Sequence, residues 1–271
     1  MNIAVIIPAA GASRRYIESA KAGGVELDRQ KIDEDLGGRP LLHRTVELFN
    51  KLQEVGTIIV AGPADHAAYE QFKQRHMDKL GILGVVLCQG GATHRYETVA
   101  NALKLVPAEA THVAVHDAAR PCTPPDLIER VLDAVRAGHT AVIPGVDVPD
   151  TLKKVGAEEL ASKEADPLAA ILGAAAPKPG ARLVEKTVDR TLLVCVQTPQ
   201  VFERNLLERA YAQTDLSSTD DAQLVERLGE PVVVVEGDPR NIKVTRARDI
   251  QLVRTIMGYK GPGEKPAHLR F

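Results

Sequence analysis

Residues 3–15 read IAVIIPAAGASRR, and this stretch sets the fold class. The five apolar residues from Ile3 to Ile7 predict a buried strand, because strands covered on both faces carry continuous β-branched runs. A loop of small residues, Pro8 to Ala12, follows and lets the backbone come close to a bound group. Arg14 and Arg15 then supply two guanidinium groups. Backbone N–H groups and arginines together indicate a site for a triphosphate at the end of this strand.

The same loop argues against a dinucleotide-binding protein. The NAD-binding fingerprint places three glycines after the first strand in the pattern G-x-G-x-x-G. This sequence has only Gly11 there, followed by two cations. NAD binding is therefore disfavoured, although a solvated surface pair remains the alternative interpretation of Arg14 and Arg15.

Short β-branched runs alternate with helical patterns along the first half of the chain, which is the rhythm of βαβ units. Right-handed crossovers between parallel strands then predict an α/β fold, a Rossmann-like, doubly wound, mostly parallel sheet covered on both faces. We expect strands at 3–7, 57–61, 85–88, 112–116, 140–143, 191–197 and 232–235, and helices near 41–54, 65–79, 94–105, 124–137, 202–213, 220–228 and 247–257.

A stretch from Val155 to Lys186 breaks this rhythm. We interpret residues 147–190 as an arm that protrudes from a single domain spanning residues 1–258, with a flexible tail at 259–271. Such an arm could embrace a second subunit, and a plain surface insertion is the alternative.

Composition and charge exclude several classes of protein. The chain has 271 residues with a formal net charge of -2, so no basic field exists to hold a nucleic acid. Its three cysteines lack C-x-x-C spacing, which favours a reducing, cytoplasmic location over disulfides or a zinc site. The apolar run at the start is too short for a membrane span and lacks the basic region of a signal peptide.

The stretch 115–121 reads VHDAARP and places Asp117 at the carboxyl end of a predicted strand. Ligands of open α/β sheets bind at that edge. A single carboxylate there can hold Mg2+, with phosphate oxygens and waters completing the coordination. Asp117 is therefore our candidate metal ligand, and the alternatives are that it caps the following turn or pairs with Arg120.

Weaker signals follow at other strand ends and turns. Gly90 and Gly91 precede Arg95 and Thr98, and two glycines allow a flat base to pack against the backbone. Four later stretches each combine a cation or hydroxyl with a turn, and taken singly they are ordinary surface charges. They read DTLK at 150–153, DR at 189–190, QTPQ at 197–200 and NIKVT at 241–245.

The joint order of these motifs, with TDD at 219–221, closely resembles the 2-C-methyl-D-erythritol 4-phosphate cytidylyltransferase family from about Ile3 to about Val253. The resemblance implies transfer of CMP from CTP to a polyol phosphate with release of pyrophosphate, in non-mevalonate isoprenoid biosynthesis. It also implies Mg2+ as cofactor and a homodimer. The stretches HDAARP and NIKVT are its most specific parts.

Site roles follow from the resemblance position by position. Arg15, Lys31 and Lys243 are implied as the catalytic cations, and Asp117 as the magnesium ligand. The implied nucleotide contacts are Ala9, Ala10, Gly11, Gly91, Thr98 and Ala118. The implied acceptor contacts are Asp117, Arg120, Thr151, Arg190 and Thr198, together with Lys243, and Arg190 is expected to reach the partner subunit's site.

This sequence departs from the family pattern at three places. The stretches between Arg15 and Lys31 and from Val155 to Lys186 are expanded, and Ala92 and Thr93 replace an acidic residue after Gly91. Two alternative functions stay open on the sequence alone. One is a ribitol 5-phosphate cytidylyltransferase, and the other is a non-catalytic nucleotide-binding protein of the same fold.

Overall fold

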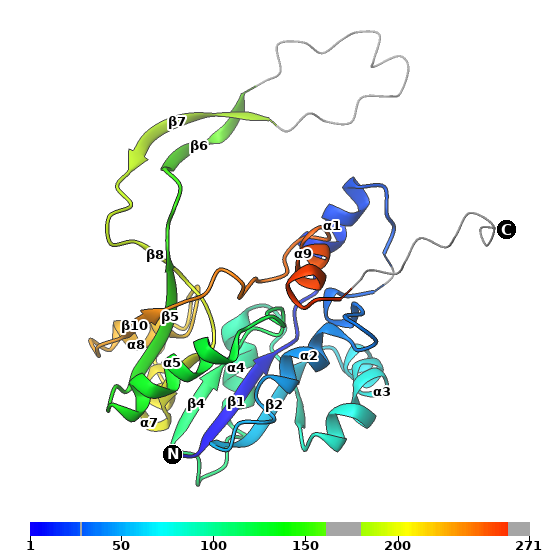
Figure 1. The fold of residues 1–271 in the computed structure, drawn as a ribbon, viewed down its shortest axis with the longest axis vertical. Coiled ribbons are helices and arrows are strands. Elements are labelled where there is room, and N and C mark those ends of the chain that lie inside the picture. The colour runs from blue at the N-terminus through cyan, green and yellow to red at the C-terminus, as the bar shows by residue number, and fades with distance from the viewer. Residues whose placement is uncertain (28, 161–179, 260–271) are drawn as a thin grey trace, which may run out of the picture. The chain divides into compact units, whose positions relative to one another are not determined.

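A computed structural model describes residues 1–27, 29–160 and 180–259. The chain divides into two compact units, one formed by residues 1–146 with the chain from Val196 onward, and the other by Asp147–Cys195 (Figure 1). In the described part of the chain, no helix combines the length and the apolar character needed to cross a bilayer.

An eight-stranded sheet forms the centre of the first unit, in the order β10-β5-β9-β4-β1-β2-β3, with β8 paired to β5. Ile6 of the central strand lies opposite Ile59 on one side and Val115 on the other, both in parallel register. The carboxyl ends of these strands therefore share one edge. The bounds are β1 (Ile3–Pro8), β2 (Val55–Gly62), β3 (Val86–Gln89), β4 (His112–Val115), β5 (Ala141–Asp147), β8 (Val194–Val196), β9 (Gln200–Glu203) and β10 (Val233–Glu236).

Strand β9 corrects one expectation from the sequence. We expected a helix to begin near Phe202, but residues 200–203 form an antiparallel strand between β4 and β5. Phe202 is fully buried and lies opposite both Val113 and Ala141. Burial between two strands outweighs the helical pattern, which starts only at Arg204.

Alternate residues of β1 pack into two different apolar layers, one on each face of the sheet. Ile3, Val5 and Ile7 pack with residues of α2, α3 and α5, whereas Ala4 and Ile6 pack with residues of α4, α7 and α8. This period of two buries both faces of the sheet, as a doubly wound fold requires. The bounds are α2 (Leu41–Glu47), α3 (His66–Ile82), α4 (Arg95–Leu103), α5 (Pro125–Arg136), α7 (Arg204–Tyr211) and α8 (Ala222–Arg227).

A third apolar cluster holds the segment between Arg15 and Lys31, where the sequence indicated only a remodelled loop. The segment begins with α1 (Arg14–Ala22) and leads into the short 3-10 helix η1 (Lys31–Asp33). Tyr16 of α1 and Leu36 after η1 pack with Ile250 and Val253 of α9 (Asp249–Ile256). The expanded segment is thus fixed on the carboxyl-terminal helix.

The second unit is built on an antiparallel hairpin of β6 (Leu152–Leu160) and β7 (Ala181–Val188). Leu152 lies opposite Val188, and Lys154 pairs with Glu185 at 2.6 Å. Residues 161–179 of the predicted arm and residues 260–271 of the predicted tail lie outside the described residues.

Candidate active site

A cavity of about 430 Å3 opens at the carboxyl edge of the sheet, where β1, β3 and β4 end. Parallel sheets bind ligands at this edge, as we predicted for Asp117. The cavity is lined by residues 8–12, 14, 15, 31, 32, 91–95, 98, 117–119 and 243. It therefore brings together ten residues singled out from the sequence: Ala9, Ala10, Gly11, Arg15, Lys31, Gly91, Thr98, Asp117, Ala118 and Lys243.

The loop after β1 forms one wall. Ala9 donates its backbone N–H to the Ala61 carbonyl at 2.7 Å, which fixes the start of the loop on β2. Ser13 adopts a left-handed conformation, with φ at 56°, and turns the chain into α1. Arg14 and Arg15 therefore stand in the first turn of a helix, where unpaired N–H groups and the positive end of the helix dipole favour an anion.

The loop after β3 forms another part of the wall. The Gly91 N–H donates to the Thr98 hydroxyl at 3.0 Å, and the Asn101 amide donates to the Gly90 carbonyl at 3.1 Å. A Cβ added at Gly91 would come within 2.1 Å of the Glu97 Cβ. The glycines are needed because the loop is packed this closely, and the Thr98 hydroxyl holds the loop from below.

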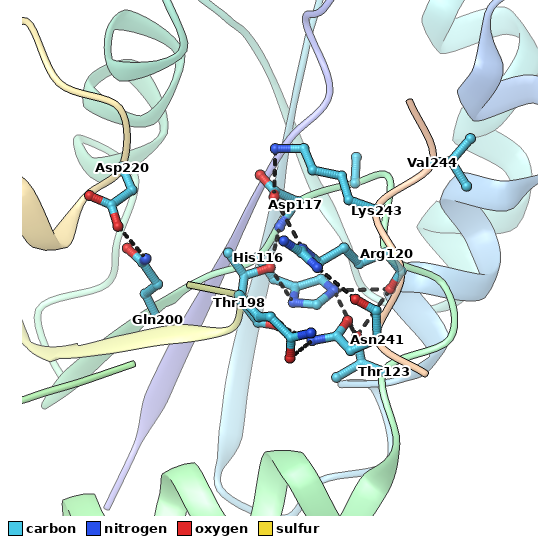
Figure 2. Close-up of polar contacts among 12 residues, drawn as sticks. His116, Asp117, Arg120, Thr123, Thr198, Gln200, Asp220, Asn241, Lys243 and Val244 are labelled. Atoms are coloured by element: carbon cyan, nitrogen blue, oxygen red, sulfur yellow. Dashed lines mark hydrogen bonds and ion pairs between the residues drawn. The ribbon is translucent and has the colours of Figure 1, made fainter. Parts of the chain in front are cut away.

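Asp117 sits among three cations, of which Figure 2 shows Lys243 and Arg120, and the third is Arg95. Its carboxylate oxygens lie 2.9 Å from Lys243 Nζ, 3.3 Å from Arg120 Nε and 3.4 Å from Arg95 Nε. Burial alone would raise the pKa of Asp117, but the charges of Lys243, Arg95 and Arg120 outweigh it and hold the pKa well below its usual range. The pairing with Arg120 that we kept as an alternative does exist, and Asp117 lines the cavity as well.

A buried network below Asp117 fixes its backbone (Figure 2). His116 Nε2 faces the Arg120 carbonyl at 3.2 Å and must carry the ring proton, because a carbonyl only accepts. Burial lowers the pKa of His116 to about 4, so the ring is neutral and its Nδ1 accepts from the Thr198 hydroxyl at 3.1 Å. The Thr198 oxygen in turn accepts the Asp117 N–H at 3.1 Å. The Thr198 proton is therefore used inside the protein.

Arg120 and Asn241 close this network. The Arg120 guanidinium donates to the Asn241 carbonyl at 2.6 Å, and the Asn241 amide donates to the Thr198 carbonyl at 2.8 Å. Thr123 donates to the Asn241 side-chain oxygen at 2.8 Å. The VHDAARP and NIKVT stretches are thus joined through buried side chains, and this joint places Lys243 beside Asp117.

Arg95 was named in the sequence analysis only as part of the motif after Gly90 and Gly91, without a role in the site. Its guanidinium bridges Asp117 to Asp221, which is fully buried and lies 2.7 Å away. Tyr211 donates its hydroxyl to the same Asp221 carboxylate at 2.5 Å. The helix predicted near 220–228 does begin here, with Asp221 at the N-cap of α8, and Asp221 is also the buried counter-charge of Arg95. A buried arginine needs such a partner.

Lys31 enters the cavity from η1. Its Nζ donates to the Val244 carbonyl at 3.2 Å, and its backbone N–H donates to the Ser13 hydroxyl at 3.3 Å. Burial, together with the charges of Lys243 and Arg15, lowers the pKa of Lys31 to about 8, although Asp117 opposes this change. The ammonium group is held among other cations, as a site for a polyanion requires.

A second cavity, of about 260 Å3, shares Arg95, Asp117 and Lys243 with the first. Its remaining lining comes from residues 120, 196–198, 200, 219 and 220. Four of the predicted acceptor contacts line this cavity: Arg120 and Thr198, with the shared Asp117 and Lys243. Two spaces that meet at one carboxylate and two cations suit a reaction between two phosphate compounds.

Thr151 and Arg190 belong to the separate unit Asp147–Cys195, where both are exposed. The Arg190 guanidinium donates to the Val148 carbonyl at 2.5 Å and also to the Pro149 carbonyl. The structure thus places these two predicted acceptor contacts within their own unit.

Comparison with known proteins adds the family to this geometry. The sequence matches the 2-C-methyl-D-erythritol 4-phosphate cytidylyltransferase family over residues 3–179 and 171–259. It is 38% identical over 265 residues to the enzyme of that name from Frankia casuarinae, covering 97% of this chain and 84% of the relative. It is 35% identical to the one from Nocardia farcinica, covering 94% of each.

Solved structures agree with these sequence matches. The crystal structure of 2-C-methyl-D-erythritol 4-phosphate cytidylyltransferase from Thermus thermophilus is similar with a TM-score of 0.64 at 30% identity, over 94% of this chain and 98% of that one. The corresponding structure from Francisella tularensis gives 0.67 at 27% identity, over 94% and 100%. The mostly parallel α/β fold predicted from the sequence is confirmed, and the chain belongs to the 2-C-methyl-D-erythritol 4-phosphate cytidylyltransferase family.

Proposed function

We propose that this protein transfers CMP from CTP to 2-C-methyl-D-erythritol 4-phosphate. An oxygen of the acceptor phosphate forms a bond to the α-phosphorus of CTP, and the bond from that phosphorus to the bridging oxygen breaks to release pyrophosphate. The observation that carries this proposal is the group of Asp117, Arg95 and Lys243, which two cavities share. The acceptor is already an anion, so no general base is required.

CTP is assigned to the larger cavity, between the loops after β1 and β3. Ala9, Ala10 and Gly11 offer backbone contacts to the phosphates, and Gly91 and Ala118 offer them to the nucleoside. Arg15, Lys31 and Lys243 then neutralise charge that develops on the α-phosphate and the leaving pyrophosphate. Cations placed in advance at such positions stabilise a transition state by several kcal/mol.

Mg2+ is the proposed cofactor, and the donor chemistry fits it. Asp117 is the one acidic side chain among the described residues that line the larger cavity. Magnesium in phosphate enzymes is commonly bound by one or two carboxylates, with substrate oxygens and waters as its other ligands. When bound, the ion supplies charge neutralisation at the phosphates. Lys243 Nζ lies 2.9 Å from Asp117 Oδ2, so Lys243 and the ion would share this carboxylate.

The acceptor is assigned to the smaller cavity, beside Arg120 and Thr198. The Thr198 hydroxyl already donates to His116. We therefore assign the hydroxyl to holding Asp117 in place, and we propose that the Thr198 side chain contacts the acceptor by packing alone. Thr151 and Arg190 are proposed as further acceptor contacts, with Arg190 supplied by a second copy of the chain. The active form is then a homodimer.

A cytoplasmic location is part of the same proposal. Cys88, Cys122 and Cys195 are free thiols, as a reducing compartment keeps them.

The test is release of pyrophosphate with CTP, UTP, GTP or ATP as donor, each combined with 2-C-methyl-D-erythritol 4-phosphate or ribitol 5-phosphate. We expect turnover with CTP and the methylerythritol phosphate. A preference for ribitol phosphate would reassign the acceptor, and no release from any pair would contradict the enzymatic proposal. As a control, Lys31→Ala should slow turnover by on the order of a thousandfold while the protein stays folded.

A further inference from the structure

A row of two buried histidines and one largely buried aspartate joins η1 to the core, outside the lining of both cavities. His76 Nε2 is 2.9 Å from Asp33 Oδ1, and His76 Nδ1 is 3.0 Å from His43 Nε2. The side chain of His76 is 1% exposed and that of Asp33 is 12% exposed, and His43 is 2% exposed. The row joins three elements, because Asp33 ends η1, His43 belongs to α2 and His76 belongs to α3.

Proton positions along the row follow from its chemistry. A carboxylate only accepts, so the 2.9 Å contact between His76 Nε2 and Asp33 Oδ1 favours the tautomer with the proton on Nε2. Burial and the neighbouring His76 lower the pKa of His43 to about 4, which keeps His43 neutral. Burial would raise the pKa of Asp33, but His76 and Arg75 outweigh burial and lower the pKa, so Asp33 is ionised. The row is a buried, charge-assisted contact between η1 and two core helices.

The turn that this row holds is the one that carries Lys31. Only Ile32 separates Lys31 from Asp33, and Ile32 is 2% exposed and lines the larger cavity. The turn is three residues long, and the backbone is extended on both sides of it. A single short turn has little stability of its own. The position of the Lys31 ammonium group therefore depends on what anchors its neighbours.

We propose that Asp33, His76 and His43 are positioning residues for Lys31, which hold η1 against α2 and α3 so that the ammonium group stays at the phosphates of the bound nucleotide. This inference rests on the proposed role of Lys31 in nucleotidyl transfer. The row contacts neither substrate itself, so its effect passes through Lys31. A displacement of about 1 Å in a group that orients a reaction can cost on the order of a hundredfold in rate.

A double-mutant cycle tests this coupling. His76→Ala should lower kcat by roughly 10- to 100-fold while the KM of the acceptor changes little. In a Lys31→Ala background the same substitution should change kcat by less than about twofold, since nothing remains to be positioned. Leu80→Ala is the matched control, because Leu80 is fully buried one turn further along α3. It should lower the thermal midpoint and leave kcat per folded molecule near that of the parent protein.

Conservative variants separate positioning from packing. Asp33→Asn retains an acceptor oxygen toward His76 and should keep most of the activity. Asp33→Ala should lower kcat by about as much as His76→Ala does. If His76→Ala does not give folded protein, Asp33→Ala and His43→Asn replace it in the same cycle.

Equal losses of kcat in both Lys31 backgrounds, or equal losses with Leu80→Ala, would overturn the inference and leave the row as core packing. The activity of the parent protein distinguishes a failure of this inference from a failure of the proposed function. An inactive parent contradicts the proposed function, whereas an active parent with an additive cycle contradicts only the positioning role.

Discussion

Raising the pH removes the charge of Lys31 before that of an ordinary lysine, so we expect kcat/KM for CTP to fall above about pH 8. Burial, Lys243 and Arg15 lower the pKa of Lys31 to about 8, against the opposing charge of Asp117. A required cation makes kcat/KM fall as the pH rises, because the Lys31 amine is charged below its pKa and loses that charge above it. With a pKa of about 8, only about a tenth of the molecules keep the Lys31 charge at pH 9, whereas a lysine with the ordinary pKa of roughly 10.4 is still almost fully charged there.

The assay measures kcat/KM for CTP between about pH 6 and pH 10 with a saturating acceptor, because this ratio reports groups of the free enzyme. Phosphate monoesters complete their ionisation near pH 6, so the substrates do not account for a fall above pH 8. Lys31→Arg is the control, since a guanidinium stays charged throughout this range. The fall in kcat/KM above about pH 8 should be absent from Lys31→Arg, whatever the absolute rate of this variant. A wild-type profile that stays flat to pH 10, or an unchanged fall in Lys31→Arg, would refute the reasoning.

Three further substitutions test other parts of the site. Asp117→Asn should raise the Mg2+ concentration needed for half activity, because one anionic oxygen leaves a hard-ion site; full activity in excess chelator would contradict the magnesium assignment. Gly91→Ala should raise the KM for CTP about tenfold or more, because its Cβ would overlap Glu97, and an unchanged KM would show that the loop adapts. Arg190→Ala should raise the KM of the acceptor alone. Mixing it with Lys31→Ala should restore activity once tagged subunits are shown to exchange, and no recovery would contradict a shared site.

The βαβ framework could be predicted because its signals are local. A continuous apolar run such as Ile3 to Ile7 and a helix start such as Pro125 carry their own evidence. Strand β9 could not be predicted, because Phe202 enters the sheet through its burial between β4 and β5, which no window of sequence contains. The helix α1 was missed for a similar reason, since its buried Tyr16 packs on α9.

The candidate site likewise has a part that could be predicted from the sequence and a part that could not. The loops after β1, β3 and β4, which supply most of the lining of the cavity, follow strand ends, where sequence patterns locate them. The residues that hold them do not: Asp221 reaches Arg95 from 126 positions further along the chain. The same separation hides His76, whose partner Asp33 lies on the other side of α2 in sequence. Such buried polar partners are determined by tertiary packing, and only the fold reveals them.

The most direct test of the proposed reaction follows the α-phosphorus of CTP by 31P NMR in a mixture with 2-C-methyl-D-erythritol 4-phosphate, Mg2+ and the purified protein. We expect the α-phosphorus to appear in a diphosphate that joins the cytidine to the acceptor, in step with an equimolar amount of free pyrophosphate. Appearance of inorganic phosphate with CDP, or no change in the CTP resonances while the protein is folded, would contradict the account.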